Sequence, residues 1–288
     1  MYSYFIDDWV EDKKYKKDLD KLDLWLTQHG IVGRKIKLGR LHDLEASIED
    51  CISGGARTIV AVGNDSTASR VLNAFLKLQP PKNINTDAAP ARTASNSSVA
   101  FAVLPIGKSN LISQCLGARD LPGAVDILTK RKIATIDLGK LNDRHYFITA
   151  AIFPKKVSLG FLSYKVSSLH KDHQISVCNT NIFSAKGDMQ NKGPFNPLDG
   201  RLEAVIAYRP RRPFWSRFSK DKSLPQEFLA ESIFPIKNIL VHGKQKTLKV
   251  LADVEKNLSS PVSAEIIPQA IDVVVGEKCS AWCVGAGA

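Results

Sequence analysis

One segment joins an apolar run to a polar, glycine-containing turn: Thr58-Ile-Val-Ala-Val-Gly-Asn-Asp-Ser-Thr67. The run at 58–62 is almost entirely apolar, as expected of a strand that is buried on both faces. A helical pattern follows the turn and extends to Leu78. Such a turn aims backbone N–H groups and the positive end of the helix dipole at an anion. The segment therefore predicts an α/β sheet with a candidate phosphate-binding turn at one strand end.

Apolar runs and helical patterns alternate on both sides of this segment. The predicted strands are Tyr2–Ile6, Ile31–Leu38 and Val99–Leu104, and the predicted helices are Lys13–His29, Asp43–Ile52, one around Leu111 and Gly123–Thr129. Alternation of this kind favours a parallel sheet covered by helices on both faces. We predict an N-terminal Rossmann-like α/β domain at residues 1–137, with the tail 276–288 as a segment that can return to it.

The pattern changes after about Asp137, where strand-like runs follow one another with turns between them. The predicted strands are Ile136–Leu138, Tyr146–Ile152, Ile175–Asn179, Arg201–Tyr208, Lys237–Val241, Leu248–Ala252 and Ile271–Val275. Long helical periods are scarce here, which is typical of antiparallel sheets. We predict a C-terminal antiparallel β-sandwich domain at residues 138–275.

A second polar turn, Pro105-Ile-Gly-Lys-Ser-Asn110, ends the strand predicted to follow in the sheet. Ligands of α/β sheets bind at the carboxyl ends of strands, so two neighbouring turns form a crevice. Taken singly, the first turn is better explained as an ordinary helix cap. Taken together, the turns give these candidate nucleotide-binding residues: Gly63, Asn64, Asp65, Ser66, Thr67, Arg70, Gly107, Lys108 and Asn110.

These motifs resemble those of the diacylglycerol-kinase catalytic-domain family, which includes bacterial lipid kinases and sphingosine kinases. Its patterns G-G-D-G-T-x-x-E and P-L-G-T-x-N-D read here as Gly63–Arg70 and Pro105–Leu111. Ile136-Asp-Leu-Gly139, Asp199-Gly-Arg-Leu-Glu203 and Asp253-Val-Glu255 follow in the order of the family. The resemblance implies a fold like that of NAD kinases and diacylglycerol kinases.

The same resemblance implies an ATP-dependent lipid kinase that transfers the γ-phosphate to a lipid hydroxyl. It places ATP at the two turns and Mg²⁺ at Asp65 and Asp199. Glu255 takes the position of the family's proton acceptor, with Asp253 in support. A solvated carboxylate on a hairpin is the alternative interpretation of Glu255.

Several positions depart from the family pattern. Asn64, Ser66 and Val254 replace glycines, Leu111 replaces an aspartate, Lys108 replaces a threonine and Arg70 replaces an acid. The family's N-terminal motif N-P-x-S-G is absent, and Asp7-Asp-Trp9 stands there, with two acids that disfavour phosphate. Two alternatives therefore stay open: a catalytically degenerate module that binds lipid or nucleotide, and a kinase with a soluble acceptor such as NAD.

The composition favours acidic partners, because the chain of 288 residues has a formal net charge of +11 and a pI near 9.4. Residues 209–222 combine basic side chains with Phe214, Trp215 and Phe218. Cations and aromatic rings together suit an anionic membrane surface, although the rings can equally pack against the β-rich half. We expect a membrane lipid as substrate and no nucleic-acid partner.

The five cysteines are odd in number and the first three are isolated, which argues against a disulfide framework. Cys279 and Cys283 lie four residues apart, and we expect them to be free thiols. No apolar run approaches the roughly 20 residues that span a bilayer, and residues 1–12 lack the pattern of a signal peptide. These observations predict a cytoplasmic protein with peripheral membrane contact. The sequence leaves the lipid and the oligomeric state open, a homodimer included.

Overall fold

The structure is a computed structural model that describes residues 1–39, 43–81, 99–161, 164–167, 173–182, 195–208 and 229–277. Its helical elements are η1 (Asp8–Glu11), α1 (Lys16–Gln28), α2 (Leu44–Ser53), α3 (Asp65–Leu78), α4 (Leu111–Cys115) and α5 (Leu121–Lys130). Its strands in the N-terminal half are β1 (Tyr2–Asp7), β2 (Arg34–Leu38), β3 (Thr58–Gly63) and β4 (Ala100–Pro105). The remaining strands are β5 (Ile133–Leu141), β6 (His145–Phe147), β7 (Ala150–Ile152), β8 (Val157–Gly160), β9 (Lys165–Ser167), β10 (His173–Cys178), β11 (Leu202–Tyr208), β12 (Leu229–Ile236), β13 (Asn238–Gly243), β14 (Thr247–Ala252), β15 (Val254–Ser259) and β16 (Val262–Val274).

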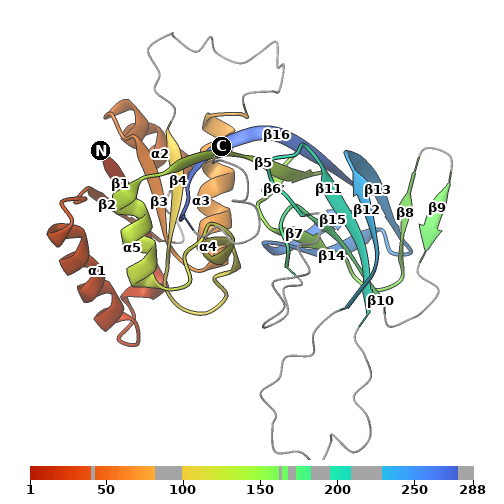
Figure 1. Cartoon of the computed structure of the whole chain (residues 1–288), viewed down its shortest axis with the longest axis horizontal. Coiled ribbons are helices and arrows are strands. Elements are labelled where there is room, and N and C mark those ends of the chain that lie inside the picture. The colour runs from red at the N-terminus through yellow and green to blue at the C-terminus, as the bar shows by residue number, and fades with distance from the viewer. Residues whose placement is uncertain are drawn as a thin grey trace, which may run out of the picture.

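The N-terminal half is a parallel sheet in the order β2-β1-β3-β4. Successive residues of β3 point to opposite faces, as in any strand. Ile59 and Ala61 join a core with α2 and α3, whereas Val60 and Val62 join another with α1 and α5. Helices thus cover both faces (Figure 1), which explains why β3 and β4 are apolar at almost every position.

The C-terminal half packs two sheets face to face. One is antiparallel, in the order β12-β11-β10-β7-β14-β15. The other continues the N-terminal sheet beyond β4 and contains β5, β6, β8, β9, β13 and β16. Their facing side chains form one core, which includes Val241 and Ala264 from one sheet and Val177 and Ala204 from the other. The chain therefore combines a Rossmann-like α/β domain with an antiparallel β-sandwich, and this prediction is confirmed.

Strands β5 and β16 connect the two halves and run side by side between them (Figure 1). The 13-residue β16 pairs antiparallel with β5 and β13, and its Val273 pairs parallel with Phe101 of β4. The predicted strand Ile271–Val275 is only the last part of it. After β16, the amides of Val275 and Gly276 donate to the carbonyls of Lys132 and Leu116, at 2.9 Å each.

The predicted strand Tyr146–Ile152 is two strands, β6 and β7, that belong to different sheets. The break falls at Ile148 and Thr149, whose amides donate to the carboxylate of Asp253 instead of to a neighbouring strand. A partly buried carboxylate has therefore replaced a strand as the hydrogen-bond partner of these amides, and an apolar pattern does not reveal such a replacement.

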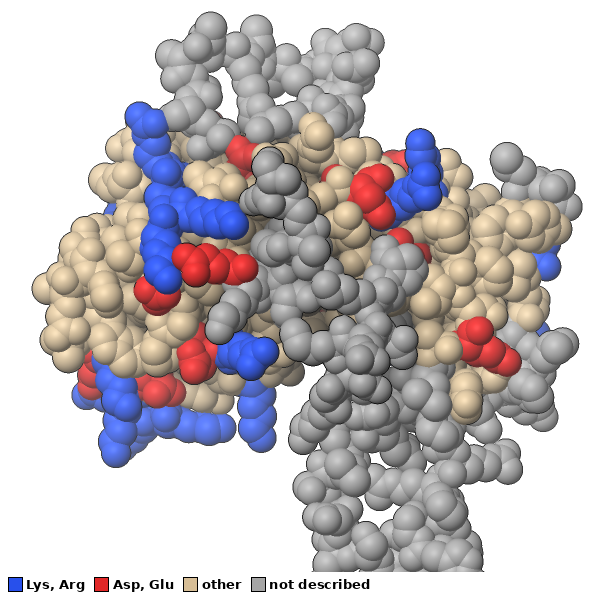
Figure 2. Space-filling view, in the orientation of Figure 1, with Lys and Arg blue, Asp and Glu red and all other residues tan. Residues whose placement is uncertain are grey.

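Lys and Arg side chains on the face shown in Figure 2 lie mainly over the α/β half, with Asp and Glu among them. Within the described ranges, no helix combines the length and apolarity needed to cross a bilayer. Cys51, Cys115 and Cys178 are free thiols. The basic aromatic segment 209–222, residues 278–288 of the tail and residues 82–98 of the loop at Pro80–Ser98 lie outside the described residues.

Candidate functional site

The turn after β3 forms a tight cap on α3. The side chain of Asn64 accepts a hydrogen bond from the amide of Thr67 at 3.2 Å. A Cβ on Gly63, whose φ is +154°, would lie 2.5 Å from Oγ1 of Thr67, so only glycine fits here. Asn64 has φ −97° and Ser66 lies inside α3, so replacing the family's glycines at these positions strains no backbone.

The second turn lies directly beside the first. The amide of Ile106 donates to the carbonyl of Gly63, and the amide of Asp65 donates to that of Ser109, both at 2.9 Å. Within the turn, Nδ2 of Asn110 donates to the carbonyl of Gly107 at 2.9 Å. The two turns therefore form one hydrogen-bonded unit at the carboxyl ends of β3 and β4.

Asp65 joins the two turns through its side chain. Its carboxylate oxygens accept hydrogen bonds from the amides of Leu111 and Ile112, at 2.9 Å each, and so cap α4. Burial raises the pKa of Asp65, and these two amides lower it. Each oxygen thus already has one protein partner, and only its remaining lone pairs are available to a metal ion.

Asp7, at the end of β1, binds two of the predicted phosphate ligands. Oγ1 of Thr67 donates to Oδ2 of Asp7 at 2.6 Å, and the Arg70 guanidinium lies 3.3 Å from the same oxygen. Beyond Asp7, the ring of Trp9 fills the space beside Gly107, where a Cβ would come within 2.8 Å of it. The segment at 7–9 therefore occupies the position of the missing family motif and places a carboxylate there.

Asp253 fixes the backbone between β6 and β7 in the β-rich half. Its carboxylate accepts from the amides of Ile148 and Thr149, at 2.6 and 3.0 Å, and from the Thr149 hydroxyl. Burial raises the pKa of Asp253 to about 6, these hydrogen bonds lower it, and the charge of Asp65 raises it further. Asp253, not Val254, has the positive φ, +54°, so valine in place of the family's glycine strains no backbone.

An open cavity of about 1210 Å³ lies between α2 and α3 on one side and the β5–β6 turn and β15 on the other. Of the predicted site residues, Ser66, Arg70 and Glu255 line it. The carboxylate of Glu255 is 58% exposed and forms an ion pair with Lys249 at 2.7 Å. The cavity thus brings the start of α3 opposite the predicted proton acceptor.

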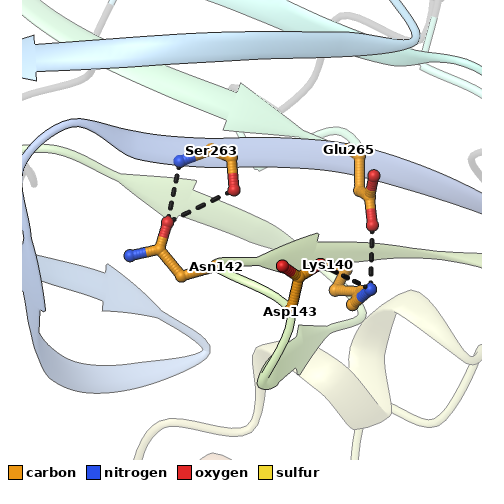
Figure 3. A network of polar contacts seen from close by, with 5 residues as sticks. All are labelled: Lys140, Asn142, Asp143, Ser263 and Glu265. Carbon is orange, nitrogen blue, oxygen red and sulfur yellow. Dashed lines mark hydrogen bonds and ion pairs between the residues drawn. The ribbon is translucent and has the colours of Figure 1, made fainter.

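The β5–β6 turn in the cavity wall is held by the network drawn in Figure 3. Nζ of Lys140 lies 3.0 Å from Asp143 and 2.9 Å from Glu265, and Oδ1 of Asn142 accepts from the amide of Ser263 at 2.8 Å. On the α3 side, Asn73 exchanges two hydrogen bonds with the backbone of Tyr146, at 2.8 and 3.0 Å. The wall is therefore tied both to β16 and to the α/β half.

Asp199 lies in a different group of carboxyls from Asp65. It lines a second cavity, of about 400 Å³, and its charge raises the pKa of Asp137 and of Glu203 beyond the larger effect of burial. None of the interactions found for Asp65 involves Asp199. In the described part of the chain, no three His, Cys, Asp or Glu side chains are grouped to hold a metal ion.

The first half of the chain matches a known family. Residues 11–141 fit the model of the diacylglycerol kinase catalytic domain. This part of the chain is therefore similar to the catalytic domain of that family. A "probable lipid kinase YegS-like" of Yersinia enterocolitica is 27% identical over 110 residues, which are 38% of this chain and 32% of the relative. The match thus spans about a third of the length of this curated relative.

Solved structures extend the similarity of fold to the whole chain. A diacylglycerol kinase from Bacillus anthracis superposes with a TM-score of 0.64 at 15% identity, covering 96% of both chains. An NAD kinase from Archaeoglobus fulgidus in complex with ATP superposes with a TM-score of 0.51 at 14% identity, covering 97% of this chain and 95% of its own. These matches support the diacylglycerol kinase-like and NAD kinase-like fold predicted from the sequence.

Sequence reasoning overlooked the contacts that Asp7 and Asn73 make. The sequence identifies Asp7 only as an acid that disfavours phosphate. Its position at the end of a strand next to β3 is the signal that indicates contact with the first turn. Asn73 lies within a helical pattern and gave no signal, because its partner is the backbone of a residue 73 positions away.

Proposed function

We propose that this chain is an ATP-dependent lipid kinase that transfers the γ-phosphate of ATP to a lipid hydroxyl. The observation that supports it most is the pairing of the two turns at Gly63 and Gly107 next to a cavity lined by Ser66, Arg70 and Glu255. The similarity of residues 11–141 to the diacylglycerol kinase catalytic domain supports the same chemistry.

In this proposal, the turns position the phosphates and the β-rich half supplies the base. Phosphoryl transfer depends chiefly on positioning and charge neutralisation. The acceptor oxygen forms a bond to the γ-phosphorus as the bond to the β,γ-bridging oxygen breaks, and the hydroxyl proton passes to the Glu255 carboxylate. Asp253, two residues before Glu255, fixes the Ile148–Thr149 backbone through hydrogen bonds.

Mg²⁺ would neutralise phosphate charge, and Asp65 is the residue that we propose to face it. Mg²⁺ commonly takes one or two carboxylates together with waters and phosphate oxygens. The remaining lone pairs of Asp65 fit such a role. Asp199 lies with Asp137 and Glu203, and we therefore propose that it does not share a metal ion with Asp65.

A degenerate module that binds lipid or nucleotide is the second candidate. The observation in its favour is Asp7, whose carboxylate accepts a hydrogen bond from the Thr67 hydroxyl and forms an ion pair with Arg70. A negative charge at that point repels phosphate. The two candidates differ in turnover, and not in whether a ligand binds.

Incubation with labelled ATP, Mg²⁺ and mixed lipids tests the proposal. We expect label in the lipid phase, whereas label in an aqueous product indicates a soluble acceptor such as NAD, and no transfer indicates the degenerate module. Glu255→Gln should reduce transfer by roughly 10²–10⁴-fold. Glu49→Gln, an exposed site on α2 outside the cavity, is the matched control and should leave transfer unchanged.

Membrane docking through residues 209–222 is a further part of the proposal. Flotation with anionic liposomes tests it, because Phe214→Ser combined with Trp215→Ser should reduce the floating fraction. Flotation of the double variant equal to that of the native chain would mean that another surface, or none, contacts the membrane.

A further inference from the structure

The acidic side chains that line the large cavity are already engaged by other groups of the protein. Asp43 caps α2, Glu45 pairs with Lys77, Asp143 with Lys140 and Glu255 with Lys249. Arg70 is likewise paired, with Asp7. The charges of Arg70, Glu45, Asp143 and Glu255 are therefore compensated by their ion-pair partners, whereas Asp43 keeps its charge at the N-terminus of α2.

Two cations of the cavity lining remain. Arg144, in the β5–β6 turn, and Lys256, on β15, form no ion pair with any residue that the structure describes. Both belong to the β-rich half and face the cavity from the side opposite α3. An uncompensated pair of cations in a concave wall attracts an anion more strongly than scattered surface charges do.

His145 lies next to these cations, and their charges affect its pKa. Burial lowers the pKa of His145, and the charges of Lys256, Arg144 and Lys77 lower it further. Burial is the larger cause of the lowered pKa, and the three cations add to it from this side of the cavity.

We propose that Arg144 and Lys256 bind the phosphate groups of the nucleotide from the β-rich half, opposite Ser66 and Arg70. This site rests on the proposed function, and it adds a cationic wall to the two glycine-containing turns. Arginine suits phosphate because its guanidinium donates two parallel hydrogen bonds, and lysine adds a mobile point charge. The Lys140 network in Figure 3 fixes the backbone from which Arg144 projects.

Calorimetric titration with ATP, inorganic tripolyphosphate and adenosine tests the site. Arg144→Gln combined with Lys256→Gln should weaken binding of ATP and of tripolyphosphate by roughly tenfold or more, which corresponds to about 1.4 kcal/mol. Lys244→Gln combined with Lys246→Gln, on the exposed β13–β14 turn, removes the same charge outside the cavity and should change binding less than twofold.

The outcomes separate this inference from the proposed function. Equal ATP affinity in the Arg144/Lys256 variant and the native chain overturns the inference and leaves the kinase proposal standing. Failure of the native chain to bind both ATP and tripolyphosphate overturns both. Binding of adenosine as tight as that of ATP also contradicts a phosphate-binding wall.

The titration of His145, followed by NMR, gives a second readout that does not depend on turnover. Tripolyphosphate should raise the pKa of His145 in the native chain, since it neutralises the neighbouring cations. The Arg144/Lys256 variant should show a raised pKa without ligand and little further change on adding it. If tripolyphosphate leaves the pKa of His145 in the native chain unchanged, the proposal is overturned.

Discussion

Asp7 is the residue that most separates this chain from the motif pattern of the diacylglycerol-kinase family. Its buried carboxylate accepts from Thr67 and pairs with Arg70, both of which belong to the motif expected to meet phosphate. Asp7 and a bound phosphate would therefore compete for the same two partners. The sequence placed acids here but did not reveal which donors they meet.

Replacing Asp7 by asparagine should tighten ATP binding by roughly three- to tenfold. The amide still accepts from Thr67, whereas the loss of charge frees Arg70 and removes repulsion in a partly buried site. Calorimetry on the native chain and the variant measures the change. Asp8→Asn, at the exposed neighbour, is the control, and an Asp7 variant that binds ATP no better than Asp8→Asn contradicts this account.

Asp253 should make stability depend on pH. Its pKa rises from 3.8 to about 6 in the folded chain, which therefore binds the proton more tightly than the unfolded chain. This contribution is complete below pH 4 and is lost as the pH rises through 6. Relative to Asp253→Asn, the native chain should lose up to about 3 kcal/mol over that range.

Urea unfolding at pH 4, 5, 6 and 7 measures this difference. Asparagine cannot accept all the hydrogen bonds of the carboxylate, so the variant should be less stable overall, and the slope with pH is the informative quantity. Asp20→Asn, an exposed site on α1, should keep the native slope. Parallel pH profiles for the native chain and Asp253→Asn would contradict a raised pKa of Asp253 in the folded chain.

At the scale of elements, β5 needs glycine within the Ile136–Gly139 motif for packing. A Cβ on Gly139 would lie 2.0 Å from the buried ring of Phe147 on β6. Gly139→Ala should therefore lower the free energy of unfolding by about 1–3 kcal/mol, because overpacking a tight core forces neighbours apart. Chemical denaturation measures it.

Gly39→Ala is the matched control for this substitution. A Cβ there meets no atom within 4 Å and the backbone does not need a positive φ, so its effect should be close to zero. Equal stability of the two alanine variants would mean that Phe147 does not pack against Gly139 as described.

The helices and strands that the sequence predicts correctly are those whose apolar or helical pattern is uninterrupted. β3 and β4, buried on both faces, and the helices α1 to α3 were predicted to within a few residues. β15 was missed because Val254–Ser259 mixes polar and apolar residues at the edge of its sheet. Strand pairing over long sequence distances, as in β16 with β4, lies beyond any local pattern.

The candidate site was predictable only where its residues are local. The two turns follow from strand order, and they lie side by side as predicted. The grouping of Asp199 with Asp137 and Glu203, and the cavity wall at Arg144 and Lys256, depend on how the β-rich half folds back toward α3. Such placement is a property of tertiary structure and leaves no spacing in the sequence.

On the scale of the whole molecule, the proposed nucleotide site requires that the α/β half and the β-rich half face the same cavity. The α/β half contributes α2 together with α3, whose first turn directly follows the Gly63 turn, and the β-rich half contributes the wall at Arg144, Lys256 and Glu255. Asn73 and the strands β5 and β16 hold these parts together. A nucleotide bound between them would contact both halves at once.

A crystal structure with a non-hydrolysable ATP analogue and Mg²⁺ tests this arrangement most directly. The account predicts phosphate density between the Gly63 turn and the start of α3 on one side and Arg144 and Lys256 on the other. Phosphates bound outside this cavity, or contacting only one half of the protein, would contradict it.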